Sequence, residues 1–220
     1  MTMYYKVLGA GHKAIHGGDY TYEPGEWTEP IEDLEECFHG YHVCDVSQLV
    51  EWCWGKDDNL PLEVWACSVS GERESNDGNK YVCKSIRLDR LVGTLDEFDI
   101  RWLGTLFAED ASKHTDDERV FQAINTARSY CVGDSTTDDL DAAYSAVGDA
   151  AADSEVLYAA QSAIDASSWN AARSSVDAAA WSAEADSTEW GAVYSVAWKA
   201  ARRAALERYS AMVFDYMRGR

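Results

Sequence analysis

The spacing of apolar positions changes part-way along the chain. Up to about residue 93, apolar and polar side chains alternate over short runs, a pattern typical of half-buried strands. The predicted strands are the runs Tyr4–Leu8, Gly40–Cys44, Leu62–Ser70 and Lys80–Leu88, and the last two show the alternation. Between the second and third runs, Ser47 is placed to cap a brief helix over Gln48–Trp54. This part of the chain therefore predicts about five short, mostly antiparallel strands and one small helix.

Beyond Gly104 the apolar positions recur every three or four residues, as in Val120, Ile124, Ala127 and Cys131. Proline is absent there and glycine is sparse, while alanine dominates, which favours long helices. The predicted helices are Glu97–Lys113, Asp117–Val132, Asp138–Ala152, Glu155–Ser167, Trp169–Ala185 and Glu189–Met217.

The two patterns predict an α+β protein with two domains. Residues 1–93 form a small antiparallel β-rich domain that contains most of the cysteines, and residues 94–220 form an alanine-rich, all-α helical bundle. Small alanine side chains let helix axes approach closely. The widely spaced tryptophans of the second domain then fill the remaining gaps in its core.

The formal net charge is −20, which bears on the partners we expect. A surface this negative repels phosphate groups, so nucleic acids and anionic membranes are not expected partners. Basic proteins are favoured, although an acidic composition also serves solubility alone. Because we find neither a membrane-length apolar run nor a signal-peptide pattern, we expect a cytoplasmic protein.

The densest group of potential metal ligands is Cys37, His39, His42 and Cys44, within eight residues. Their spacing does not match the ligand spacing of known zinc sites. We therefore predict no metal and no cofactor, and assign Cys37, Gly40 and Cys44 structural roles. In a reducing compartment the six cysteines are expected to stay free thiols.

No motif for nucleophilic or acid–base catalysis is present, so no catalytic residue is assigned. His12, His16, Asp19, Glu23 and His42 contain groups suited to acid–base chemistry, but nothing in the sequence brings them together. The candidate binding residues are His16, Trp27, Tyr41 and His42 in the first domain, and Arg202 and Arg203 in the last helix. The basic group on that helix is also explained by pairing with acidic helices of the same chain.

Two parts of the chain resemble known families. Residues Tyr5–Val92 carry Tyr5-Lys6-Val7, Pro24-Gly25-x-Trp27 and Cys37-x-x-Gly40-Tyr41-His42-x-Cys44, and resemble an uncharacterised domain common in phage and prophage proteins. The helical part is similar to an immunity protein family of bacterial polymorphic toxin systems, through Trp102–Ala111, Asp117-x-Arg119, Ala123-Ile124, Ala127-Arg128 and Gly133. Among the matched residues Asp110, Asp117, Arg119 and Arg128 are structural, and we expect Asp110 or Asp117 to pair with Arg119 or Arg128 between the first two helices.

Together these observations predict a non-enzymatic phage or prophage accessory protein that binds and neutralises a protein partner. One alternative is a reduced ADP-ribosyltransferase-like enzyme in which His42 contacts the nucleotide and Tyr4, Tyr41 or Glu63 assists. Another is a protein that sequesters a signalling nucleotide. A fourth hypothesis, a DNA mimic, is disfavoured because the acidic residues are scattered among alanines.

Overall fold

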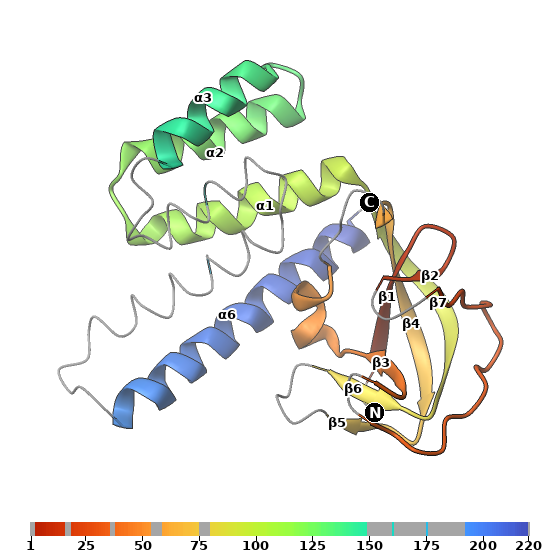
Figure 1. The fold of residues 1–220 in the computed structure, drawn as a ribbon. Coiled ribbons are helices and arrows are strands. Elements are labelled where there is room, and N and C mark those ends of the chain that lie inside the picture. Colours follow the sequence, from red (N-terminus) through yellow and green to blue (C-terminus); the bar gives the residue numbers. More distant parts are fainter. Residues whose placement is uncertain are drawn as a thin grey trace. The chain divides into compact units, whose positions relative to one another are not determined.

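The computed structural model describes residues 3–15, 19–35, 38–53, 59–74, 80–148, 160, 175 and 192–219. The protein is α+β, with antiparallel strands in its N-terminal half and helices in its C-terminal half (Figure 1). The elements of the first half are β1 Tyr4–Gly9, β2 Lys13–Ala14, β3 Tyr41–Val43, the 3₁₀ helix η1 Val46–Glu51, β4 Leu62–Ser70, β5 Arg73–Glu74, β6 Tyr81–Cys83 and β7 Ser85–Leu95. The helices that follow are α1 Glu97–Ala111, the 3₁₀ helix η3 Ser112–His114, α2 Glu118–Cys131, α3 Thr137–Gly148 and α6 Ala192–Arg218.

The chain divides into two compact units. The first consists of Met1–Asp96 together with Ser210–Arg220, and the second of Glu97–Tyr209. The boundary lies three residues beyond the predicted one, and the last eleven residues belong with the β-rich unit. Helix α6 therefore contributes residues to both units.

The first unit contains two antiparallel sheets, ordered β2-β1-β4-β7 and β3-β6-β5. Strand β4 spans the predicted range because apolar and polar residues alternate along it. Strand β3 lies beside β1 through paired backbone hydrogen bonds between Tyr5 and Cys44. The core enclosed by these strands contains Leu8, Tyr22, Val43, Cys67, Cys83, Ile86 and Leu88.

The single strand predicted over Lys80–Leu88 is wrong, because the structure divides this range between β6 and β7. The Lys84 amide, between the two strands, donates to the Ser70 carbonyl at 2.9 Å. Strand β7 then continues to Leu95, beyond the predicted end, since its backbone stays paired with β4. The extension was not predicted because Asp89 and Arg90 interrupt the alternation of apolar residues.

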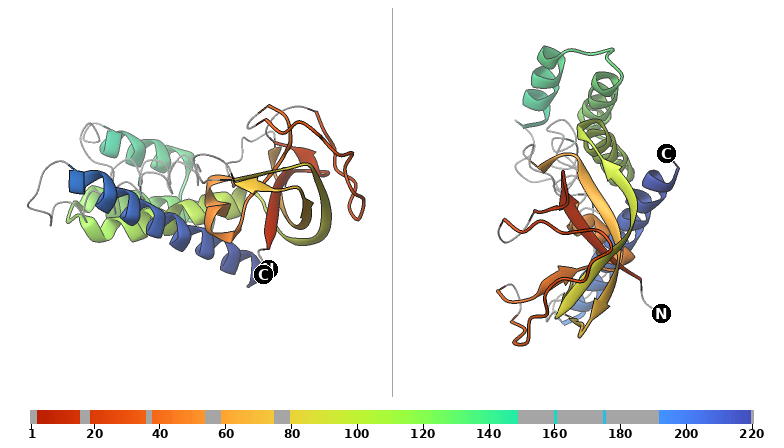
Figure 2. Two further views of the ribbon diagram at one scale, coloured as in Figure 1. Left: turned by 90° about the horizontal axis from the view of Figure 1, so that it is seen from below. Right: turned by 90° about the vertical axis from the view of Figure 1, so that its right-hand side faces the viewer.

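Strand β7 is irregular where it follows β4, and Figure 2 shows the two as long, bent arrows that run side by side. Ala66 pairs with Arg90, while the next residue, Cys67, pairs with Leu88. Asp89 is therefore an extra residue in β7, a β-bulge. The bulge changes which side chains share a face, and this shapes the hollow described below.

The short helix η1 differs from the prediction in type and start. Asp45, rather than Ser47, is its N-cap: the Asp45 carboxylate accepts from the Ser47 amide at 2.8 Å, and the Gln48 side chain accepts from the Asp45 amide. Buried Ser210, near the end of α6, accepts from the Val50 amide and donates to the Ser47 carbonyl, each at 3.0 Å. The end of α6 thus holds η1 within the first unit.

The second unit has an alanine-rich core, as predicted. Ala108, Ala111, Ala123 and Ala127 are buried with Val120, Ile124, Leu140 and Val147. Gly133, at a φ of 83°, follows α2 and ends it. Asp117 caps α2 and Thr136 caps α3, since these side chains accept hydrogen bonds from free amides of the first turn.

The helices predicted over Glu155–Ser167 and Trp169–Ala185 lie outside the described residues, apart from the single positions Ala160 and Ser175. Both of these are buried, and the Ser175 hydroxyl donates to the Phe107 carbonyl at 2.8 Å. Among the helices that the structure describes, none combines the length and apolar character needed to span a bilayer.

Candidate functional site

An irregular segment, residues 19–35, covers the edge of β7 in the first unit. Three of its amides donate to carbonyl oxygens at 2.9 Å each: Gly25 to Leu88, Thr28 to Ile86 and Ile31 to Lys84. The buried Thr28 hydroxyl also accepts from the Ile86 amide at 3.0 Å. The segment takes the place of a further strand at this edge, so its backbone is held in place without regular structure.

This segment, called the acidic segment below, is strongly negative. It contains no lysine or arginine, and all seven of its acidic residues are exposed: Asp19, Glu23, Glu26, Glu29, Glu32, Asp33 and Glu35. Trp27 and Tyr20 are also exposed, by 48% and 42%. The acidic segment thus presents aromatic and carboxylate side chains together on a fixed backbone.

Trp27, a predicted binding residue, lies beside a polar cluster on β4 and β7. The Arg87 guanidinium lies 5.3 Å from the Trp27 ring centre and pairs with Asp89 at 2.7 Å. The Ser68 hydroxyl donates to the other Asp89 oxygen, also at 2.7 Å. Cation–π contact with Arg87 orients the indole while leaving half of its surface exposed.

Tyr41, another predicted binding residue, belongs to a group of three tyrosines. Its ring meets those of Tyr20 and Tyr22 edge-on, with centroids 5.9 and 6.3 Å away, and its hydroxyl donates to the Glu29 carbonyl at 3.0 Å. Burial raises the pKa of the Tyr22 hydroxyl. Tyr41 therefore packs against the acidic segment and bonds its backbone at Glu29.

In the Gly40-Tyr41-His42-x-Cys44 motif, Gly40 serves the backbone conformation and Cys44 packs in the core. Gly40 has a φ of 136°, and a side chain there would collide with Val82. Cys44 is buried, and its thiol contacts the Tyr5 carbonyl at 3.7 Å. His42 is half-buried, and its carbonyl oxygen accepts a hydrogen bond from Lys6.

Cys37 and His16 lie outside the described residues, so the predicted cysteine–histidine group is only partly placed. Within the described part of the chain, no three His, Cys, Asp or Glu side chains gather as metal ligands would. Burial raises the pKa of Cys53, Cys67 and Cys83 to about 12, and it raises the pKa of Cys44 well above its usual range. These thiols are protonated at neutral pH and are weak nucleophiles.

Lys6 places an amine between the two sheets. Its Nζ donates to the His42 carbonyl of β3 at 2.7 Å and lies 5.4 Å from the Tyr22 ring centre. Burial lowers the pKa of this amine to about 8. No ion-pair partner for it occurs among the residues that the structure describes, so its charge is poorly compensated.

A histidine and a carboxylate meet at the turn after β1. His12 adopts a φ of 60°, and its Nε2 lies 3.5 Å from Glu63, which also accepts from the Gly11 amide and the Trp65 indole. Three contacts hold this carboxylate, which is largely buried. The contact of His12 with Glu63 was not predicted, because a turn and a distant strand supply the two residues.

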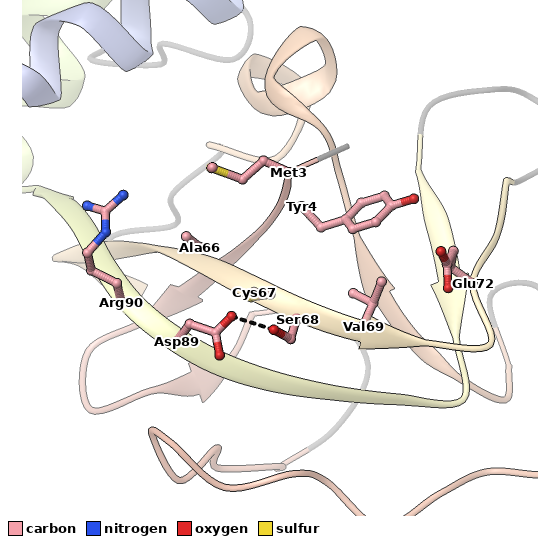
Figure 3. A pocket seen from close by; sticks show the side chains of 9 residues that line it. All are labelled: Met3, Tyr4, Ala66, Cys67, Ser68, Val69, Glu72, Asp89 and Arg90. Carbon is pink, nitrogen blue, oxygen red and sulfur yellow. Dashed lines mark hydrogen bonds between the residues drawn. The ribbon is translucent and has the colours of Figure 1, made fainter. Parts of the chain in front are cut away.

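A hollow of about 520 Å³ lies beside β4 and β7 (Figure 3). Its lining residues are Met3, Tyr4, Ala66, Cys67, Ser68, Val69, Glu72, Asp89 and Arg90. Apolar side chains lie along its middle, while Arg90 stands at one end and Glu72 at the other. None of the predicted binding residues that the structure describes lines it.

The four predicted structural residues of the second unit all form ion pairs, although not as expected. Asp117 pairs with Arg119 at the start of α2 instead of between helices. Arg128 of α2 reaches α1 through Glu109 at 2.6 Å and lies near the Trp102 ring. The pairing expected for Asp110 is wrong, because consecutive residues of a helix are rotated by about 100°, and Asp110 therefore faces α6 while Glu109 faces α2.

Asp110 instead contacts Lys113 and, on α6, Arg208 and the Tyr209 hydroxyl. Burial opposes ionisation of Asp110, but hydrogen bonds from Lys113 and Tyr209 outweigh it and lower its pKa. Arg203 pairs with Glu207 of the same helix at 3.1 Å, and Arg202 is half-buried. The Asp110–Arg208 pair agrees with pairing of basic residues of the last helix within the chain.

Comparison of the chain with protein-family models, with curated proteins and with solved structures finds no match.

Lys6, Arg87, Asp89 and Arg90 belong to polar sites that were not predicted from the sequence. Lys6 is the one polar residue of the run Tyr4–Leu8, and this is the only signal that it left in the sequence. Asp89 and Arg90 interrupt an apolar alternation, and such an interruption indicates a bulge only once the partner strand is known.

Proposed function

We propose that this protein is a non-enzymatic binding protein, and that its first unit docks a basic protein partner through the acidic segment. The supporting observation is the coincidence of seven exposed carboxylates with exposed Trp27 and Tyr20 on a backbone bonded to β7. Aromatic side chains are enriched at protein interfaces, and charge complementarity accelerates the encounter of two proteins.

The fixed backbone of the acidic segment favours this role over that of a solvated loop. A segment that is already ordered loses little conformational entropy when a partner binds. The contact of Arg87 with Trp27 and of Tyr41 with the Glu29 carbonyl limits the motion of the interface further. Neutralising a partner requires a long-lived complex, and such preorganisation contributes to one.

The resemblances to a phage domain and to an immunity family give the proposal its setting. We infer an accessory protein of a phage or prophage that acts in the cytoplasm of the host and neutralises a protein there. The partner carries a basic surface, which the acidic segment attracts.

Affinity capture from host lysate tests the proposal when two charge-reversal variants accompany the wild type. The first carries Glu23→Lys, Glu26→Lys and Glu29→Lys in the acidic segment. The control carries Asp116→Lys, Asp134→Lys and Asp141→Lys, which change the net charge equally at exposed positions of the second unit. We expect a salt-sensitive complex with the wild type and the control, and its loss with the first variant.

Trp27→Ala is expected to weaken the same complex without changing its dependence on salt, because it removes contact area and no charge. Equal capture by both triple variants would contradict docking at the acidic segment. Calorimetry with NAD, run in parallel, would reveal the nucleotide-binding alternative.

A further inference from the structure

Tyr20 is an exposed aromatic residue of the acidic segment whose ring has no cation beside it among the described residues. Elsewhere in the described part of the chain, six aromatic rings have an arginine or lysine within about 6 Å of the ring centre: Tyr22, Trp27, Trp102, Tyr130, Tyr209 and Phe214. Trp27 is therefore already in contact with Arg87, whereas the ring of Tyr20, 42% exposed, is available to a cation from another molecule.

The backbone holds Tyr20 in place against β2. The Ala14 amide donates to the Tyr20 carbonyl at 2.8 Å, and the next residue, Thr21, pairs with Lys13. Successive side chains of an extended chain point to opposite faces, so Lys13 and Thr21 share one face and Tyr20 lies on the other. Lys13, a neighbouring lysine, is therefore not placed to cover the Tyr20 ring.

Glu29 brings a carboxylate to the same group of tyrosines. The Tyr41 hydroxyl donates to the Glu29 carbonyl at 3.0 Å, and the Tyr41 ring meets that of Tyr20 edge-on, with centroids 5.9 Å apart. Burial, Tyr41 and the negative charge of Glu29 all raise the pKa of the Tyr20 hydroxyl, which agrees with a carboxylate near the phenol. The Glu29 side chain is exposed and forms no ion pair with the described residues.

We propose that an arginine of the basic partner binds here, with its guanidinium over the Tyr20 ring and paired with the Glu29 carboxylate. This inference rests on the proposed function and names the group that the acidic segment recognises. A guanidinium is planar, so it can stack on an aromatic ring while its N–H groups donate to a carboxylate. An ammonium is a more strongly hydrated point charge, so lysine is expected to bind less tightly.

The probe is the capped peptide acetyl-Gly-Arg-Gly-Arg-Gly-amide, compared with its lysine counterpart. Each peptide is titrated into the full-length protein at low ionic strength, and NMR follows the ring signals of Tyr20. We expect millimolar binding of the arginine peptide with a shift of these signals, and binding of the lysine peptide that is about threefold weaker or more.

Two variants each remove one contact. Tyr20→Leu and Glu29→Gln are each expected to weaken binding of the arginine peptide about threefold to tenfold, whereas Tyr20→Phe keeps the ring and should bind nearly as the wild type does. Glu26→Gln is the matched control, because it removes one exposed carboxylate of the same segment, and we expect a smaller effect. All three positions are exposed, so the variants should fold, and circular dichroism checks this.

The proposal is overturned if the arginine peptide does not bind at several millimolar, or if the lysine peptide binds as tightly. Equal losses with Glu29→Gln and Glu26→Gln, or unchanged binding with Tyr20→Leu, would also overturn it, because net charge alone would then explain the attraction. Any of these results leaves docking at the acidic segment intact, since the triple charge reversal tests it separately. Capture that ignores the charge reversal would instead refute the proposed function, whatever the peptides show.

Discussion

At the scale of single residues, Lys6 is the least conventional feature of the first unit. A buried ammonium with a carbonyl and an aromatic ring as its neighbours is less stable than the same group in water. Its depressed pKa expresses this difference, because the folded state holds the proton less tightly than the unfolded chain does.

Lys6→Met is therefore expected to stabilise the protein at pH 7, by about 1–3 kcal/mol. The folded pKa of about 8 lies below the ordinary value of 10.5, so the penalty is fully present below pH 8. It is lost as the pH rises toward 10.5, where both states are neutral. The advantage of the variant should shrink accordingly between pH 7 and pH 10.

Urea denaturation of the variant and the wild type at several pH values measures this difference. The buried cysteines and Tyr22 titrate in both proteins at high pH, so only the difference between them is informative. Lys84→Met, at an exposed lysine, is the control and should show no such trend. A constant or growing advantage from pH 7 to pH 10 would contradict the account of Lys6.

At the scale of elements, the entry into β3 depends on Gly40. The residue adopts a left-handed φ, and the space that a β-carbon would occupy is filled by Val82 of β6 and Leu34 of the acidic segment. Only glycine lets β3 approach β6 at this point while the chain turns out of the acidic segment.

Gly40→Ala is expected to destabilise the protein by about 2–4 kcal/mol, since backbone strain and overpacking add. Gly25→Ala is the matched control: its φ is also positive, at 84°, but nothing lies within 4 Å of the added methyl group. We expect the control to lose only about 1 kcal/mol, from the dihedral alone. Equal losses in thermal or urea denaturation would exclude a steric role for Gly40.

At the scale of the whole molecule, a net charge of −20 produces repulsion within the folded chain. The ion pairs described, such as Arg128 with Glu109 and Asp110 with Arg208, relieve it only locally.

Raising sodium chloride from about 20 mM to 0.5 M is expected to raise the melting temperature by several degrees, since screening acts on long-range repulsion over lengths near 10 Å. A scanning-calorimetry series in chloride salts measures this. A melting temperature that falls with salt would mean that local ion pairs outweigh the general repulsion.

The regular strands and helices of this fold could be predicted from the sequence. Strand β4 and the helices near residues 97, 118 and 137 follow from side-chain spacing, which local burial determines. Long-range pairing determines the rest. The bulge at Asp89 depends on the register with β4, and the grouping of Ser210–Arg220 with the first unit depends on contacts such as that of Phe214 with Tyr5.

The residues of the candidate site also fall into those predicted from local sequence and those that depend on long-range contacts. Trp27, Tyr41 and Gly40 were identified from their local chemistry, and the structure places all three in or beneath the acidic segment. Arg90 and Glu72 line one hollow although they lie in different parts of the sequence, and His12 contacts Glu63 of a distant strand. Local sequence patterns do not connect such residues.

Hydrogen–deuterium exchange on the captured complex tests most directly whether the acidic segment is where the partner docks. We expect amides of residues 19–35 to exchange more slowly in the complex than in the free protein, while those of α3 stay unchanged. Slower exchange confined to the helices of the second unit, with residues 19–35 unaffected, would contradict the proposed function.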